Sequence, residues 1–130
     1  MPFETKAVQF EIPAVNYGLQ TASGLLKLEG EELLIEFQVK DALFEVFKSD
    51  VEEVAIPLRA LQSVEYKKGW FSSRIVLEAD SLRVFDEIPG ADQGECILKI
   101  KRKERKEAEK LVSKIRLVMS EIKLNDLNEE

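Results

Sequence analysis

Histidine is absent from the 130-residue sequence, and cysteine occurs once, as Cys96. The absence of histidine removes the usual zinc sites, the Ser–His and Cys–His nucleophile pairs, and the commonest general base near neutral pH. A single cysteine excludes an intrachain disulfide and a thiolate metal cluster within one chain. The sequence also lacks a phosphate loop, a GxGxxG motif and an EF-hand loop. We therefore predict no catalytic, cofactor-binding or metal-binding residues, and a protein that is not an enzyme.

Long hydrophobic runs are also missing. Apolar runs such as Ile75 to Leu77 are only a few residues long, whereas a membrane-spanning helix needs about 20. Residues 1–6 lack the basic and apolar regions of a signal peptide. We expect no transmembrane helix and a cytoplasmic location.

An excess of positive charge is lacking as well, since 19 Lys and Arg stand against 25 Asp and Glu, a net charge of −6. This balance argues against nonspecific nucleic-acid binding, which needs cations to neutralise phosphates. The charge is uneven, because residues 101–130 hold nine Lys and Arg and seven Asp and Glu. The sequence therefore predicts an acidic sheet followed by a basic helix start.

Alternation of apolar and polar residues predicts about seven β-strands. One is expected to run up to Pro13, and a hairpin is expected around Gly30-Glu31, between residues 24–29 and 32–39. Val54 to Ile56, just before Pro57, is typical of an edge strand because proline has no N–H to donate. Further strands are expected on both sides of Gly69 and over residues 95–100, residues 80–90 fit either a helical turn or a strand, and residues 42–47 form a short apolar segment.

The apolar period changes near the C-terminus, where residues three and four apart form one stripe from Ala108 to Ile122. This spacing predicts an amphipathic helix over about 103–124 that docks on the sheet. We expect residues 125–130 to be a frayed acidic tail, residues 1–21 to be an N-terminal extension with one strand, and residues 22–124 to form the domain. The predicted fold is mainly β: a bent antiparallel sandwich or partial barrel, with the helix closing one end.

This order resembles the pleckstrin-homology-like (PH-like) superfold. The run "IPLRALQSVEYKKGWFSSRIVLEADSL" and the later "IPGADQGE" are similar to uncharacterised bacterial PH-like proteins. The resemblance implies a binding module rather than an enzyme, but not a particular partner, because the superfold hosts lipid binders, peptide binders and protein binders. In its phosphoinositide-binding members, cations surround the loop between the first two core strands. Here that loop is Glu29 to Glu32 and is acidic, so we expect no phosphoinositide binding through it.

The stretch "YKKGWFSSR" is the candidate interaction surface, through Lys67, Lys68, Trp70, Phe71 and Arg74. Three interpretations are open. The aromatic residues fold back as an anchor over the open end of the sandwich, or they contact a protein or a second copy of the chain, or they enter an anionic membrane beside the cations. We expect the anchor role, in which case Trp70→Ala lowers the melting temperature.

Two other features have competing interpretations. The basic run of Lys99, Lys101, Arg102, Lys103, Arg105 and Lys106 is expected to be a solvated helix face. An acidic partner segment is the alternative, and RNA is disfavoured because aromatic residues are not interleaved. Cys96 shares a strand face with Leu98 and Ile100 and is expected to be a buried small hydrophobic residue.

The sequence as a whole predicts a non-enzymatic interaction module that contacts an unidentified protein or self-associates, through the 67–71 hairpin or the Val54 to Ile56 edge. One alternative is a peripheral membrane adaptor that binds anionic lipid through the same hairpin. A second is a small-ligand-binding domain or carboxylate-dependent enzyme at the open end of the sandwich.

Overall fold

The computed structural model describes residues 6–15, 18–41, 43 and 50–129. These residues form seven strands, two 3₁₀ turns and one α-helix. The strands are β1 (Val8–Val15), β2 (Gln20–Glu29), β3 (Glu32–Asp41), β4 (Glu52–Pro57), β5 (Leu61–Lys67), β6 (Ser73–Ala79) and β7 (Glu95–Ile100). The 3₁₀ turns are η1 (Leu58–Ala60) and η2 (Arg102–Glu104), and the helix is α1 (Arg105–Asn128).

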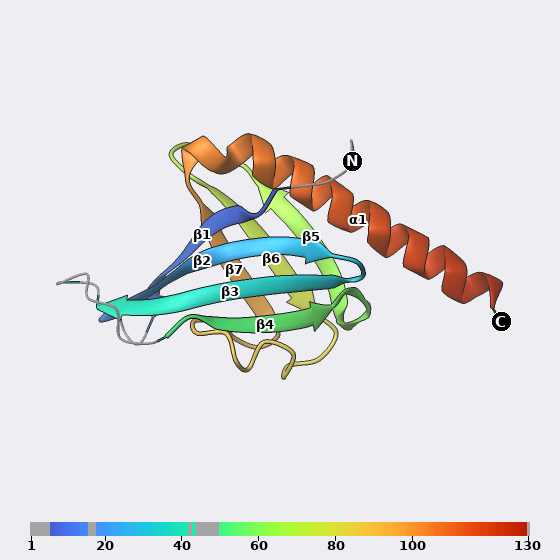
Figure 1. Ribbon diagram of the computed structural model, residues 1–130, viewed down its shortest axis with the longest axis horizontal. Coiled ribbons are helices and arrows are strands. Elements are labelled where there is room, and N and C mark those ends of the chain that lie inside the picture. The colour runs from blue at the N-terminus through green and yellow to red at the C-terminus, as the bar shows by residue number, and fades with distance from the viewer. Residues whose placement is uncertain (1–5, 16–17, 42, 44–49, 130) are drawn as a thin grey trace.

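All strand pairs are antiparallel, and the sheet order is β4-β3-β2-β1-β7-β6-β5. The sheet is not closed, so β4 and β5 are its edges. Figure 1 shows the strongly bent sheet, with α1 across one end. The predicted mainly β fold with one C-terminal helix is confirmed, and so is the edge position of Val54 to Ile56 within β4.

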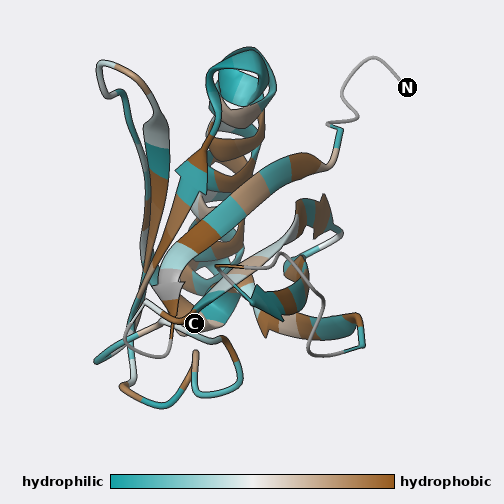
Figure 2. Ribbon diagram, turned by 90° about the vertical axis from the view of Figure 1, so that its left-hand side faces the viewer, coloured by the Kyte–Doolittle hydropathy of each residue, from teal (hydrophilic) through white to brown (hydrophobic). Residues whose placement is uncertain are grey.

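One core fills the bend of the sheet. Alternate residues of each strand point into it, as in β7, where Cys96, Leu98 and Ile100 are fully buried. The hydropathy colours in Figure 2 follow this alternation along the strands. The helix contributes Ala108, Leu111, Val112, Ile115 and Ile122 from one face. The apolar residues of the strands and of the helix therefore pack into the same core.

Strand β1 joins the two halves of the sheet, since it lies between β2 and β7. It runs past its expected end at Pro13 as far as Val15, with a shift of register between Ile12 and Val15 that accommodates the proline. Its Val8, Phe10 and Ile12 are buried in the common core. Residues 8–15 are thus an integral part of the domain, and an expected boundary at residue 21 does not separate them from it.

Three segments differ from the sequence expectations. The helix continues to Asn128, beyond the expected end at 124, and Asp126 pairs with Arg59 of η1 rather than lying in a frayed tail. Residues 80–90 form consecutive turns instead of a helix or strand, because Phe85 and Ile88 are both drawn into the core from one short connection. The apolar segment 42–47 lies outside the described residues, apart from Leu43, which is exposed.

No described helix combines the length and the apolar character needed to cross a bilayer.

Candidate interaction surface at the hairpin tip

The tip that carries Trp70 is formed by β5 and β6. These strands pair from Leu61 with Ala79 up to Lys67 with Arg74, which leaves residues 68–72 as the connection. A side chain on Gly69 would place its Cβ 2.1 Å from the carbonyl oxygen of Ser72. Glycine is therefore required for the connection to close in this form.

Polar side chains lie beneath the tip. The Tyr66 hydroxyl and the Ser73 hydroxyl lie 2.7 Å apart in a hydrogen bond. Ser73 is fully buried and pairs with Ile100 of β7. This end of the core is filled by the first turns of α1, where Ala108 and Leu111 are fully buried.

Trp70 and Phe71 accordingly face solvent, with exposed fractions of 86% and 82%. Their ring centroids are 6.5 Å apart in an edge-to-face arrangement. The anchor interpretation is therefore wrong, because neither ring packs against the core. Two large, adjacent exposed aromatic side chains are unusual on a free surface and are typical of a contact site.

Arg105, the first residue of α1, fixes the position of the tip. Its Nη2 donates hydrogen bonds to the carbonyl oxygens of Gly69, at 2.8 Å, and Trp70, at 3.3 Å. The guanidinium thus satisfies two backbone acceptors in a connection 35 to 36 residues away. These hydrogen bonds hold the backbone that carries the aromatic pair. The start of α1 therefore lies beside the tip, as Figure 1 also shows.

This contact brings together two groups of cations that are separate in the sequence. The hairpin supplies Lys67, Lys68 and Arg74, and the start of the helix supplies Arg102, Lys103 and Lys106, all exposed. Lys99 of β7 lies directly opposite Arg74, although like charges at opposed positions are unfavourable. We call this set, with Trp70 and Phe71, the basic-aromatic end; its residues are Lys67, Lys68, Trp70, Phe71, Arg74, Lys99, Arg102, Lys103 and Lys106.

The basic run divides between two roles. Lys101 pairs with Glu11 at 3.0 Å, the Glu104 carboxylate accepts a hydrogen bond from the Gln9 amide, and Arg105 holds the tip. These three residues bind the helix start to the sheet. Arg102, Lys103 and Lys106 are exposed, as is Lys99 of β7, and they fit the expected solvated face.

The acidic turn Glu29 to Glu32 lies far from the basic-aromatic end, at the β2–β3 connection on the right of Figure 1. There the Glu31 carbonyl accepts a hydrogen bond from the Leu58 amide, and its carboxylate lies 3.9 Å from Arg59. The acidic turn and the basic-aromatic end therefore occupy different ends of the molecule.

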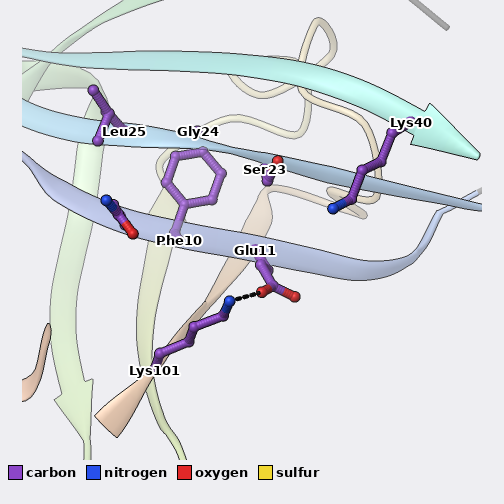
Figure 3. A pocket seen from close by; sticks show the side chains of 8 residues that line it. Phe10, Glu11, Ser23, Gly24, Leu25, Lys40 and Lys101 are labelled. Atoms are coloured by element: carbon purple, nitrogen blue, oxygen red, sulfur yellow. Dashed lines mark ion pairs between the residues drawn. The ribbon is translucent and has the colours of Figure 1, made fainter. Parts of the chain in front are cut away.

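A hollow lies on the outer face of β1, β2 and β3 (Figure 3). It has a volume of about 430 Å³. Its polar lining includes Lys40 and the Lys101–Glu11 ion pair, which neutralises one of the two lysines. The sequence did not predict this hollow, because it depends on the pairing of β1 with β2 and of β2 with β3.

Cys96 is completely buried in the core. Desolvation raises the pKa of its thiol to about 12, which keeps it protonated and unreactive. The expectation of a buried hydrophobic residue is confirmed.

Comparison with protein-family models, with curated protein sequences and with solved structures finds no match to this chain.

Proposed function

We propose that this chain is a cytoplasmic, non-enzymatic interaction module of PH-like fold, and that it contacts an acidic protein surface through the basic-aromatic end. The bent antiparallel sheet followed by one helix across its end supports the PH-like assignment. The observation that carries the function is the exposure of Trp70 and Phe71 on a tip held in place by Arg105.

The basic-aromatic end combines two exposed aromatic rings with a tip that hydrogen bonds hold in place. Tryptophan and arginine dominate the binding energy of protein interfaces, and a preorganised site loses little conformational entropy when it binds. The surrounding cations favour an acidic partner and speed its approach. Self-association along the free edge of β4 belongs to the same proposal, although Glu52, Glu53 and Pro57 oppose edge pairing there.

An anionic bilayer is the second candidate, favoured because cations from two segments meet around the aromatic pair. Among the described residues, no ion pair engages Lys68, Arg74, Lys99, Arg102, Lys103 or Lys106. At about 1 kcal/mol for each cation near an anionic surface, four would give a dissociation constant of about 1 mM and six about 40 µM. The three hairpin cations alone would give weaker than millimolar binding.

Trp70 is the only tryptophan in the sequence, so its fluorescence reports on binding of either candidate at the basic-aromatic end. Its fluorescence should shift to shorter wavelength when phosphatidylglycerol vesicles are added, but not with phosphatidylcholine vesicles, and the shift should weaken at higher salt. Phe71→Ser, with the reporter intact, should reduce the effect. An unchanged spectrum at all vesicle concentrations would remove the bilayer candidate and leave the protein partner.

Capture of partners on the immobilised full chain tests the protein candidate. Proteins retained by the wild type should be lost from Trp70→Ser/Phe71→Ser and kept by Leu82→Ser. Leu82 is a matched control because it is also exposed, at 70%, and lies in the connection between β6 and β7. Equal retention by both variants would overturn the assignment of the surface.

A further inference from the structure

The solvent-facing side of α1 carries a second apolar stripe, distinct from the one that docks on the sheet. Leu117, Leu124 and Leu127 are exposed at 53%, 60% and 66%. With Ser113 and Ser120, also exposed, they follow the alternating spacing of four and three residues that marks a coiled-coil seam. The helix thus has one face for its own sheet and another without a partner among the described residues.

Part of this exposed stripe lies where the helix extends beyond the sheet. In Figure 1 the C-terminal part of α1 continues past the strands. Leu124 and Leu127 lie in that part, beyond Ile122, the last buried residue of the helix. A projecting helix segment gains little from packing on its own sheet, so a second helix along this face would supply the missing contact.

We propose that α1 pairs with α1 of a second copy of this chain, in parallel, through the seam formed by Ser113, Leu117, Ser120, Leu124 and Leu127. Leu117 and Leu124 take the a positions of two heptads, and the other three take the d positions. The seam is short, because Lys110 occupies the preceding a position. Since the helix is already formed and held by the sheet, the pairing need not include the cost of helix formation.

The charges beside the seam select the second copy and its direction. In a parallel pair, each g position meets the e position five residues later on the partner. This places Glu109 against Lys114 of the second copy and Arg116 against Glu121 of the second copy. Both combinations are of opposite charge, and each occurs twice by symmetry.

The antiparallel arrangement is disfavoured by the same residues. When Leu117 is set against Leu127 of the other copy, Glu121 faces Glu121 and Lys123 faces Lys123 across the centre. Both contacts are repulsive. The helix is more basic in its first half, with a net +3 over residues 105–116, and more acidic in its second, with a net −2 over residues 117–129. This coarse asymmetry would favour antiparallel pairing, but the flanking charges are in direct contact and outweigh it.

A parallel pair would place both helix starts, and so both basic-aromatic ends, on the same side of the dimer. Two such ends would engage one partner surface together and bind far more firmly than one. This consequence rests on the proposed function, whereas the pairing of the helices does not. The expected interface is small, so the dimer should be weak and reversible.

Analytical ultracentrifugation of the full chain tests the seam. We expect concentration-dependent dimers, an affinity at least about 100-fold lower for Leu124→Glu, and no loss for Leu82→Glu, the exposed control. Circular dichroism should show both variants folded, since both leucines are exposed. A wild type that stays monomeric at about 1 mM, or a dimer that tolerates Leu124→Glu, would overturn the proposal.

Charge exchange and crosslinking test the direction. Glu121→Arg should weaken the dimer several-fold, and Arg116→Glu/Glu121→Arg should restore it, because the exchanged pair is again of opposite charge. Ser113→Cys in a Cys96→Ala background should form a disulfide between the two copies when a mild thiol oxidant is added to accept the two electrons. Failure of both the restoration and the disulfide would overturn the parallel arrangement, and neither result depends on binding at the basic-aromatic end.

Discussion

Replacing Trp70 with alanine should leave the stability of the fold nearly unchanged. Only about 14% of the residue is covered, given its 86% exposure. For an aromatic side chain of up to about 250 Å², this corresponds to about 35 Å² of buried area. At about 25 cal/mol per Å², the loss is at most about 0.9 kcal/mol. The contact with Phe71 adds little, because both rings are exposed to water.

Urea denaturation followed by far-ultraviolet circular dichroism measures this change without relying on the tryptophan signal. Leu77→Ala is the control, since Leu77 is fully buried and its truncation should cost about 2 to 5 kcal/mol. If Trp70→Ala cost as much as Leu77→Ala, the indole would be part of the core, and the reasoning that makes it a contact residue would be refuted.

Three further predictions concern the supports of the site and the core. Arg105→Ala should remove the hydrogen bonds to the Gly69 and Trp70 carbonyls and speed amide exchange in residues 68–72 more than in β7; equal exchange in the two regions would contradict the tie. Gly24→Ala should lower the free energy of unfolding by more than about 2 kcal/mol in urea denaturation, because the added Cβ would lie 1.7 Å from the Glu36 carbonyl oxygen; a neutral result would contradict the close strand packing. The pKa of Cys96, raised by burial from 9.0 to about 12, should make stability fall as pH rises from 9 to 12, because the unfolded thiol loses its proton first. This fall should be smaller in Cys96→Ala, and equal slopes would contradict the burial.

The strands and the helix were largely predictable because each buries one face, which leaves a period of two or of three to four residues in the sequence. The central position of β1 was not, since pairing with β7 is a contact between residues about 90 apart, such as Glu11 and Lys99. The same limit applies to the site. Trp70 between two strands is compatible with an anchor or a contact, and only its exposure in the structure decides between them.

The gathering of cations was also beyond sequence reasoning. The hairpin and the basic run were each too weakly charged to suggest firm binding. They are brought together by the pairing of β6 with β7 and by the hydrogen bonds from Arg105 to the Gly69 and Trp70 carbonyls. Periodicity in the sequence reports which face of an element is buried. It does not report which turn lies beside which helix end.

The most direct test of the interaction surface is quantitative capture from the native cell, with membranes included, on the immobilised wild type and on Trp70→Ser/Phe71→Ser. Bound protein and bound phospholipid are both measured. We predict that the material retained by the wild type is lost from the double variant and kept by Leu82→Ser. Retention of the same material in the same amount by the double variant would contradict the assignment of the basic-aromatic end as the binding surface.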